Sequence, residues 1–407
     1  MRDGQETGVS TTPLAKVADA RAPIVYGIVQ PGPECPSGVP FVQSRDVGGA
    51  VDVNVLNRTS QQIAEQYRRS KIAPGDILFS LRGNIGQSSI TPAELHGANI
   101  ARGVARIRVG AKGDPEFVRY VLQGPVLQRL IARNANGSTF RELSIEELRK
   151  LPIPNVGLPE QRKIADILRT WDEALEKLTS LRKAKERRLG ALRAALLFGR
   201  LRLKGLRHNW APTRLEAVTH ELTKRNGAKG LGRERVMGVT RAKGVVPMRE
   251  QTIAADISRY KRLPPRAFAY NPMRINVGSI AMNERDVAVL VSPDYVVFAC
   301  NSDRLDPDYL DHLRKTSWWA HYINSGGSGS VRQRTYYDDL AALKLPLPEL
   351  DEQKAIAAVL DTARADLAAT EREIEALTRQ KRGLMQKLLT GEWRVATGEK
   401  GSMEAAE

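Results

Sequence analysis

The sequence has little of what enzymes and secreted proteins use for chemistry or for cross-linking. It contains two cysteines in 407 residues, far apart and without Cys-x-x-Cys spacing, which argues against a disulfide framework and against a zinc site. Its five histidines show no metal-ligand spacing. It has neither a Walker A sequence nor a Gly-x-Gly-x-x-Gly fingerprint after a strand. The sequence therefore predicts no catalytic residue, no metal site and no cofactor on this chain.

Long apolar runs are missing as well. No run approaches the roughly 20 residues that span a bilayer, and the polar N-terminus lacks the apolar segment of a signal peptide. With 42% hydrophobic and 27% charged residues, the composition is ordinary for a globular protein. We therefore expect a cytoplasmic protein of two or three domains with no membrane partner.

Charge is the strongest signal in the composition. The formal net charge is +17, and the excess lies in residues 1–344, whereas residues 345–407 are net acidic. A basic protein of this kind is expected to bind a polyanion such as nucleic acid. The alternative is a merely solvated basic surface.

The chain also contains one segment written twice. Residues Leu158–Gly199 align without a gap with Leu350–Gly391, at an offset of 192 residues, and a Leu-Pro-x-Pro stretch precedes each copy. Pro159 and Asp351 suit the first turn of a helix, and the terminal glycines suit helix ends. An internal repeat of this length indicates duplicated structure.

Each copy predicts one long helix. Apolar residues recur alternately every three and four positions, which is the heptad pattern of a coiled-coil seam. About 39 residues at ~1.5 Å each give a helix of roughly 58 Å. Equal length and equal register favour an antiparallel pair over two unrelated amphipathic helices. The predicted seam residues are Ile164, Leu168, Trp171, Leu175, Leu178, Leu189, Leu192, Ile356, Leu360, Leu367, Ile374, Leu377 and Leu384.

Two regions rich in turn signals and short apolar runs precede the two helices, and each predicts a mixed α/β domain. In the first we expect helices near 60–69 and 115–132. Several positions of the second region match the first at the same 192-residue offset. The predicted organisation is a disordered lead-in (1–13), a first domain (14–150), a central helical segment (151–205), a second domain (206–344), a C-terminal helical segment (345–394) and a tail (395–407).

A matching turn in each domain carries residue types that read DNA. Arg82 and Asn84 occupy the first turn, and Arg274 and Asn276 occupy the second. Arginine binds guanine bidentately and asparagine binds adenine in the same way, so these types suit base or phosphate contact. The alternative is that they fix the turn, with asparagine bonded to local backbone.

Further candidate contacts lie in two polar loops, 134–141 and 324–334, and after two predicted strands. The loops are rich in small residues and end in arginine, which suits phosphate positioning, although a plain solvent loop is the alternative. These candidates are Arg45, Ser138, Arg141, Arg241, Lys243, Ser330, Arg332 and Arg334.

Three stretches together resemble one known family. They are Tyr26-Gly-Ile-Val-Gln-Pro-Gly-Pro33, Asp76-Ile-Leu-Phe-Ser-Leu-Arg-Gly-Asn-Ile-Gly86, and the doubled Leu-Pro-x-Pro…Glu-Gln…Ile-Ala helix start. On these residues the chain, over about 14–394, resembles the specificity subunit of a type I restriction-modification system. The resemblance implies an α+β fold with two similar target-recognition domains, separated by two long helices that pair as an antiparallel coiled coil with pseudo-twofold symmetry.

The resemblance also implies a function and partners. Each domain would read one half of a split, asymmetric target in double-stranded DNA, and the helices would act as a ruler and dock two methylation subunits. The chain would not be an enzyme by itself. S-adenosylmethionine, ATP and Mg are expected on the methylation and restriction subunits. Ile275 stands where the first domain has Gly83, and Arg332 where it has Phe140, so the second domain is expected to contact DNA differently.

Two rival hypotheses come from other classes of protein. One is a coiled-coil scaffold whose basic domains bind nucleic acid without sequence preference. The other is a single-chain nuclease or methyltransferase, which the missing catalytic motifs disfavour. The ratio of specific to non-specific binding separates the scaffold from a sequence-reading subunit.

Overall fold

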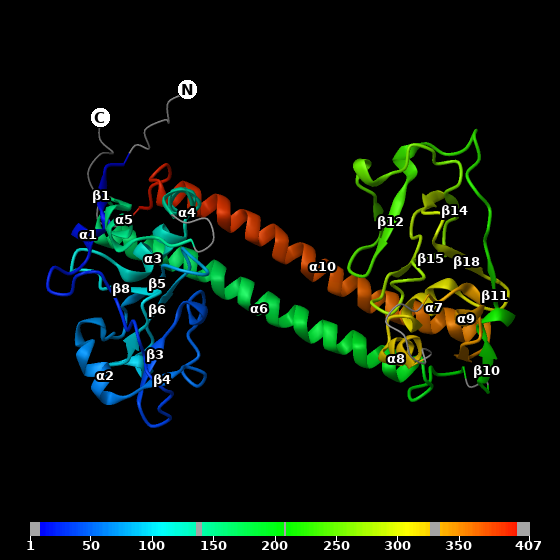
Figure 1. Cartoon of the computed structure of the whole chain (residues 1–407), viewed down its shortest axis with the longest axis horizontal. Coiled ribbons are helices and arrows are strands. Elements are labelled where there is room, and N and C mark those ends of the chain that lie inside the picture. The colour runs from blue at the N-terminus through cyan, green and yellow to red at the C-terminus, as the bar shows by residue number, and fades with distance from the viewer. Residues whose placement is uncertain (1–8, 136–140, 207–208, 326–333, 397–407) are drawn as a thin grey trace, which may run out of the picture. The chain divides into compact units, whose positions relative to one another are not determined.

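The computed structural model describes residues 9–135, 141–206, 209–325 and 334–396 (Figure 1). The chain divides into two compact units. The first comprises Met1–Thr179 with Arg372–Glu407, and the second comprises Ser180–Glu371. Each unit therefore contains one of the predicted domains and part of both long helices. No helix in the described residues has the length and apolar character needed to cross a membrane.

The first unit is built on a four-stranded antiparallel sheet in the order β2-β8-β5-β6, with a three-stranded sheet β4-β3-β7 beside it. Helix α3 packs on β6, and its buried aromatic residues join the core that the sheet shares with the long helices. The elements are β1 (Thr11–Pro13), α1 (Leu14–Val17), β2 (Val25–Tyr26), β3 (Val39–Val42), η1 (Ser44–Asp46), β4 (Arg58–Thr59), α2 (Gln61–Gln66), η2 (Arg68–Ser70), β5 (Ile77–Ser80), β6 (Ser88–Ile90), η3 (Ala93–Leu95), β7 (Asn99–Ile100), β8 (Val104–Ile107), α3 (Pro115–Gln123), α4 (Pro125–Asn134), α5 (Ile145–Lys150) and β9 (Pro152–Pro154).

The second unit repeats this plan, with a four-stranded antiparallel sheet in the order β11-β18-β15-β16. Its helices α7, α8 and α9 begin 192 residues after α3, α4 and α5. The elements are β10 (Ala211–Arg214), η4 (Leu215–Ala217), β11 (Thr219–Glu221), η5 (Arg233–Arg235), β12 (Met237–Thr240), β13 (Gly244–Pro247), η6 (Glu250–Thr252), β14 (Lys261–Leu263), β15 (Phe268–Tyr270), β16 (Ile280–Met282), β17 (Val289–Val291), β18 (Val296–Cys300), α7 (Pro307–Leu313), α8 (Ser317–Ser325), α9 (Tyr337–Ala341) and β19 (Lys344–Leu347).

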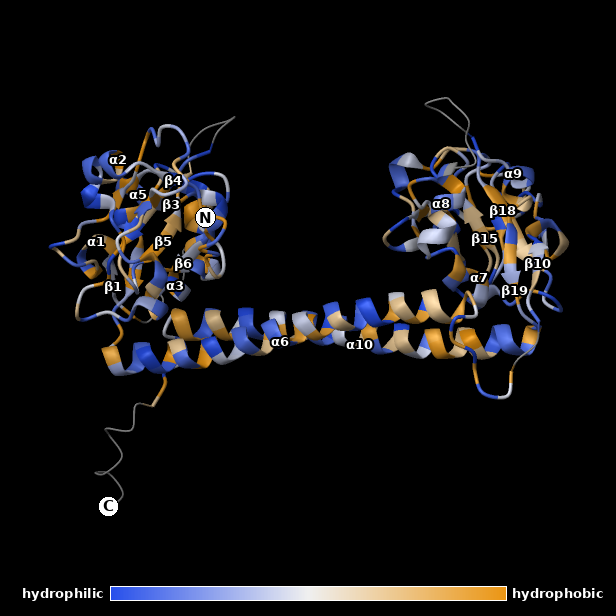
Figure 2. Cartoon of the chain, turned by 90° about the horizontal axis from the view of Figure 1, so that it is seen from below, coloured by the Kyte–Doolittle hydropathy of each residue, from blue (hydrophilic) through white to orange (hydrophobic). Residues whose placement is uncertain are grey.

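The two long helices are α6 (Leu158–Leu196) and α10 (Leu350–Leu389), and they run antiparallel to each other in each unit. Hydrophobic and hydrophilic residues are interspersed along both (Figure 2). In the first unit, residues near the start of α6 share a core with residues near the end of α10, and Lys381 pairs with Asp172. In the second unit, the Lys185 ammonium lies 2.7 Å from an Asp366 carboxylate oxygen. All the predicted seam residues are buried or half-buried.

A glutamate and a glutamine fix the start of each long helix. Glu352, fully buried, accepts hydrogen bonds from the Arg202 guanidinium at 2.8 and 3.0 Å and from the Trp210 indole at 3.1 Å. Its counterpart Glu160 accepts from the Arg394 guanidinium at 2.7 and 2.9 Å. The arginines, like the glutamates, are 192 positions apart, so these ion pairs are equivalent. Each ion pair ties one helix start to the segment that follows the end of the other helix.

The neighbouring glutamines attach the globular domains to the helix starts. Gln353 Oε1 accepts from the Asp306 backbone N–H at 2.8 Å, and Gln161 Oε1 accepts from the Asp114 N–H at the same distance. Each glutamine also donates from its amide to a carbonyl just before its helix: Gln353 to Pro348, and Gln161 to Val156. The Glu-Gln pair in the repeat is therefore structural.

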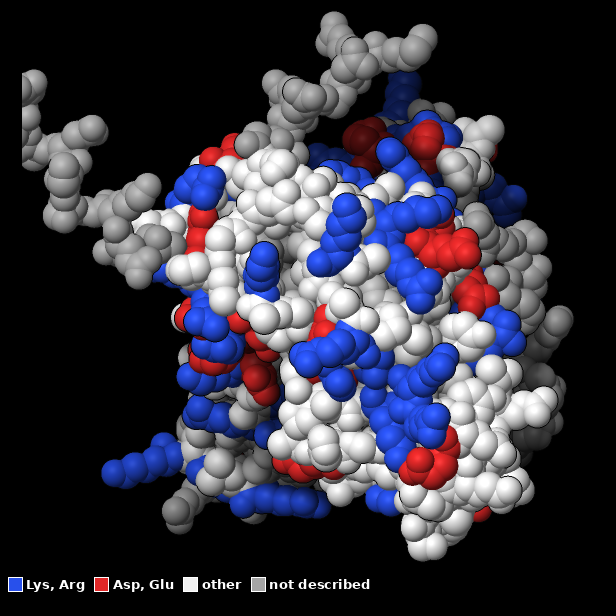
Figure 3. Space-filling view, turned by 90° about the vertical axis from the view of Figure 1, so that its left-hand side faces the viewer, with Lys and Arg blue, Asp and Glu red and all other residues white. Residues whose placement is uncertain are grey.

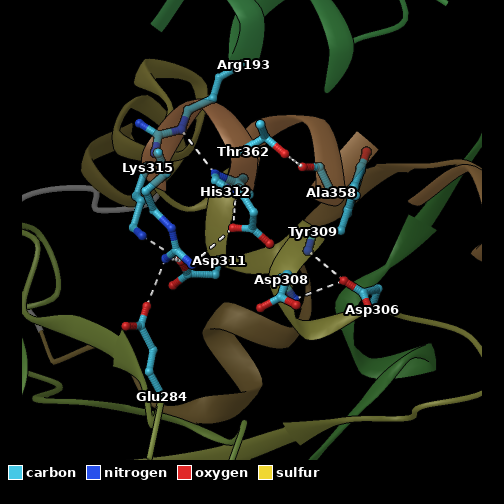
Figure 4. A network of polar contacts seen from close by, with 12 residues as sticks. Arg193, Glu284, Asp306, Asp308, Tyr309, Asp311, His312, Lys315, Ala358 and Thr362 are labelled. Atoms are coloured by element: carbon cyan, nitrogen blue, oxygen red, sulfur yellow. Dashed lines mark hydrogen bonds and ion pairs between the residues drawn. The ribbon is translucent and has the colours of Figure 1, made fainter. Parts of the chain in front are cut away.

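A buried polar network joins helix α7 to both long helices in the second unit (Figure 4). His312 has no exposed side-chain area; its Nε2 donates to Asp361 of α10 at 3.0 Å, and its Nδ1 accepts from Arg193 of α6 at 3.3 Å. Asp311, also buried, accepts from Arg314 and Lys315. Burial lowers the pKa of His312, and the nearby cations lower it further. The hydrogen bond to Asp361 acts in the opposite direction, but the net effect is a decrease.

The first unit uses a smaller network at the equivalent place. Tyr120, which stands 192 positions before His312, donates its hydroxyl proton to Asp172 of α6 at 2.6 Å. Asp172 also pairs with Lys381 of α10. Tyrosine keeps the same attachment of a domain helix to both long helices without a group that titrates near neutral pH.

The structure departs from three predictions about local structure. The lead-in predicted over 1–13 ends in a strand, because Thr11–Pro13 pair antiparallel with Pro152–Pro154 and the Thr12 hydroxyl donates to Asn155 at 2.6 Å. The helix predicted near 115–132 is two helices, because Pro125 starts a new helix and leaves Gly124 in an extended conformation. The first residue of the tail predicted from 395 is held to the first unit, because the Val395 N–H donates a hydrogen bond to Glu160.

Candidate nucleic-acid interface

Hydrogen bonds bring the predicted segments of the first unit together at one end of its sheets. The Ser44 hydroxyl of η1 donates to the carbonyl of Gly103 at 2.9 Å, and the Leu81 N–H donates to the same carbonyl at 2.8 Å. The Asn84 amide donates to the Val47 carbonyl at 2.6 Å. Segments 44–47, 81–86 and 101–103, which are distant in sequence, therefore form one surface.

Arg82 and Asn84 have different roles in this surface. Asn84 Oδ1 also accepts from the Ser80 hydroxyl at 2.6 Å, so its amide is used at both ends within the domain, as the turn-fixing interpretation predicts. The Arg82 guanidinium donates to Glu142 at 2.5 Å, and the two backbones form an isolated antiparallel bridge. This hydrogen bond raises the pKa of Arg82 and keeps it cationic. Arg82 is half-buried and remains open to a ligand.

Two other predicted arginines of the first unit are exposed but partly engaged. Arg45 donates to the Asn57 side chain at 3.0 Å and lies 3.6 Å from an Asp46 carboxylate oxygen. Arg141 donates to the Ala132 carbonyl at 3.0 Å. Both side chains can exchange these weak surface contacts for phosphate contacts at small cost.

The second unit assembles three segments that correspond to 44–47, 81–86 and 141–143 of the first unit, where the Leu143 N–H donates to the Leu81 carbonyl at 3.0 Å. The Ser279 hydroxyl donates to the Val239 carbonyl at 2.9 Å, which joins the turn 271–278 to strand β12. The aliphatic part of Arg241 packs against Gly278. Gly278 has a φ of +86°, and a side chain at this position would collide with Arg241. The Thr335 N–H donates to the Pro272 carbonyl at 3.1 Å, which places Arg334 beside the start of the turn.

The basic side chains of this second surface are exposed. Arg241 and Lys243 lie in the loop of the β12–β13 hairpin, and Arg274 lies in the turn. Among the described residues, no carboxylate pairs with Arg274. Arg334 donates to the Tyr336 hydroxyl at 3.3 Å, which raises the pKa of Arg334. Asn276 uses its side-chain oxygen to accept from the Val277 N–H at 2.9 Å, which leaves its amino group outward.

The remaining predicted contacts, Ser138, Ser330 and Arg332, lie outside the described residues, as does the Phe140 compared with Arg332. Sequence reasoning missed two basic residues that the structure adds to these surfaces. Arg102, exposed, precedes the Gly103 that both segments contact, and Arg285 lines a hollow of about 540 Å³ with Arg241 and Lys243. The Arg-Gly dipeptide at 102–103, which repeats the one at 82–83, was the available signal for Arg102.

Basic side chains are spread over the face of the first unit that Figure 3 shows, with acidic side chains beside several of them. The described residues contain no group of three or more His, Cys, Asp or Glu side chains placed to hold a metal ion. Half-buried Cys300 has its pKa raised to about 12 by desolvation, so it is no nucleophile near neutral pH. The chemistry available at the two surfaces is hydrogen bonding and charge, which suits recognition of DNA.

Comparisons with known proteins agree with this architecture. The family described as Type I restriction modification DNA specificity domain matches residues 35–186 and 268–379. The Type I restriction enzyme EcoBI specificity subunit of Escherichia coli is 33% identical over 157 residues, which is 38% of this chain and only 33% of that relative. The putative type I restriction enzyme MjaX specificity subunit of Methanocaldococcus jannaschii is 24% identical over 394 residues, covering 88% of each chain.

A solved structure shares the whole fold. The crystal structure of the Type-I restriction-modification system S subunit from M. genitalium superposes with a TM-score of 0.59 at 14% identity, over 96% of this chain and 98% of that one. The family match covers two segments 233 residues apart at their starts, one in each unit's domain and extending into the following long helix. The chain belongs to the family of type I restriction-modification specificity subunits.

Proposed function

We propose that this chain is the DNA-reading subunit of a type I restriction-modification complex and reads a bipartite, asymmetric target, with one half per domain. One observation carries the proposal: each unit brings the end of a strand, a matching turn (81–86 or 271–278) and the segment after the polar loop (141–143 or 334–335) into one basic surface, but with different side chains. Equivalent segments give both domains the same mode of approach to DNA, and different side chains give the two half-sites different sequences.

The two long helices have a separate role in this proposal. They fix the gap between the half-sites and dock two methylation subunits, which carry S-adenosylmethionine, and restriction subunits with ATP and Mg complete the complex. Exposed residues on α6 and α10 outside the seam provide surface for such docking. This chain contributes recognition and assembly, and the partner subunits contribute the chemistry.

The proposal is tested by assembling the full chain with its methylation subunits and mapping methylated adenines on genomic DNA. We expect every methylated site to share two short sequences separated by a constant number of unread base pairs. Methylation without a shared sequence would instead favour the non-specific scaffold. Methyl transfer or DNA cleavage by the isolated chain would contradict the assignment of chemistry to the partners.

A binding measurement distinguishes the same alternatives without catalysis. The assembled complex should bind a duplex with the mapped target at least 10³-fold more tightly than a scrambled duplex, the lower end of the range for specific DNA-binding proteins. Both constants must be measured at one salt concentration, because phosphate contacts depend steeply on salt. Equal affinities would contradict the proposal.

A further inference from the structure

The turn 271–278 of the second unit exposes two apolar side chains. Met273 is 51% exposed and Val277 is 55% exposed, and they flank exposed Arg274 and Asn276. Single exposed apolar residues are common on protein surfaces. Two of them, interleaved with an arginine and an asparagine in a turn already placed among basic residues, form a mixed surface whose composition requires an explanation.

The equivalent turn of the first unit has the opposite pattern. There, Leu81 is 2% exposed and Ile85 packs on the core, whereas Gly83 between them faces outward. In the second turn Ile275, which replaces Gly83, is the buried residue, at 4% exposed. The inward and outward positions are therefore exchanged between the two turns. Ile275 already provides the buried apolar side chain that holds the second turn on the domain. The exposed Met273 and Val277 are therefore not needed for the fold.

The second turn is also rigid. The Arg274 N–H donates to the Asn271 carbonyl at 2.9 Å, the Gly278 N–H to the Ile275 carbonyl at 2.9 Å, and the Ser279 N–H to the Arg274 carbonyl at 3.1 Å. The Asn271 side chain accepts from the Met273 N–H at 2.9 Å. A turn that is bonded in this way presents its outward side chains in a fixed order without loss of backbone entropy on binding.

The ligand must offer acceptors for a guanidinium and an amide together with small apolar groups within a few ångströms. The major groove of DNA offers this combination: guanine carries N7 and O6 acceptors, adenine carries an N7 acceptor, and thymine carries an O4 acceptor beside its C5 methyl group. The surrounding Arg241, Lys243 and Arg334 supply charge for the flanking phosphates. An apolar protein partner would not match this ring of exposed cations.

We infer that Met273 and Val277 are specificity-determining residues that contact thymine C5 methyl groups in the half-site read by the second domain. The inference rests on the proposed function, and it further specifies the base that is recognised, thymine, and the group that is contacted, its C5 methyl. Arg274 and Asn276 then bind base edges or phosphates between the two methyl contacts. The first domain lacks this mode of recognition, because its equivalent apolar residues are buried.

Deoxyuridine gives a direct test, because it differs from thymidine only by the C5 methyl. The assembled complex is titrated with duplexes in which each thymine of the mapped target is replaced in turn by deoxyuridine. We expect wild type to lose about fourfold in affinity per contacted methyl, the factor that corresponds to one buried methyl-sized group. Replacement in the half-site read by the first domain should have no such effect.

Protein variants couple the effect to named side chains. Met273→Ala and Val277→Ala should each bind the thymine duplex more weakly and lose their sensitivity to deoxyuridine at one position. Val287→Ala, which removes the same atoms as Val277→Ala from another exposed valine of the second unit (43% exposed), serves as the control and should behave as wild type. Unchanged thermal unfolding of all three variants shows that the turn still folds.

Three results would overturn the inference. They are equal affinity for thymine and deoxyuridine at every position, sensitivity that persists in both alanine variants, and a second-domain half-site with no thymine on either strand. Weaker assembly of Met273→Ala with methylation subunits, without any deoxyuridine effect, would assign the apolar pair to a protein partner and also overturn it. A complex with no sequence preference at all would refute the proposed function instead.

Discussion

Lengthening both long helices by one heptad tests whether they set the spacing of the DNA target. Seven residues are added after Leu181 in α6 and seven at the matching place after Glu373 in α10. One full heptad preserves the seam. The Lys185–Asp366 ion pair lies beyond one side of both insertions and the Asp172–Lys381 pair beyond the other side, so neither is interrupted.

The size of the change follows from helix geometry. Seven residues lengthen each helix by about 10.5 Å, which corresponds to about three base pairs at ~3.4 Å per step. Three base pairs also rotate the duplex by roughly 100°, since one turn takes about 10.5 base pairs. The lengthened protein must then bind a target with a wider gap by bending or twisting DNA, or lose specific binding.

The assay measures binding of the assembled complex to duplexes whose gap is varied by single base pairs. A heptad added to α6 alone is the control, and it should disturb helix pairing and lower the unfolding temperature. Unchanged affinity of the doubly lengthened protein for the original target at its original gap would refute the ruler. The helices would then serve only as an attachment site for partners.

Three further predictions concern single side chains. Glu352→Ala should destabilise the protein by about 3 kcal/mol in urea unfolding, because it removes the fully buried acceptor of the half-buried Arg202 and Trp210 side chains, and by more than Glu160→Ala, whose arginine partner is mostly exposed; equal costs would contradict this reasoning. Arg82→Ala and Arg274→Ala should each weaken recognition by roughly 1–3 kcal/mol and relax specificity in a different half-site if each arginine contacts a base, whereas uniform weakening on all sequences would identify phosphate contacts. His312 has a folded pKa below its unfolded value, so its contribution to stability is complete above about pH 6.5 and declines as pH falls from there toward the folded pKa; chemical unfolding should show this slope in wild type and lose it in His312→Gln.

The long helices were predictable because their signal is local and repeated. A heptad pattern sustained over about 39 residues leaves few alternatives, and the glycines after each end adopt positive φ, 68° at Gly199 and 72° at Gly391, as helix termini favour. The strand Thr11–Pro13 was missed because its partner lies about 140 residues away in sequence, which no local pattern encodes.

The site was predictable as a set of segments but not in its bonding. The 192-residue repeat indicated equivalent turns in the two domains, and the structure places each turn beside the other predicted segments. It did not indicate that Asn84 is bonded within the domain while Asn276 points outward, because the Val47 carbonyl that Asn84 contacts lies 37 residues away in sequence. Nor did it indicate that Arg82 meets Glu142, sixty residues later, whereas Arg274 meets no described carboxylate.

The Arg82–Glu142 pair also has a consequence for how the protein searches DNA. In the proposed function, a duplex bound by Arg82 competes with Glu142 for the guanidinium, and a carboxylate that lost its partner would lie near the phosphates, where like charges repel. Only a sequence with a suitable donor, such as a cytosine amino group, would give that carboxylate a new partner. Arg274 carries no such internal competitor among the described residues. We therefore expect Arg82 to contact DNA mainly where the sequence also offers Glu142 a donor, whereas Arg274 is available to any duplex.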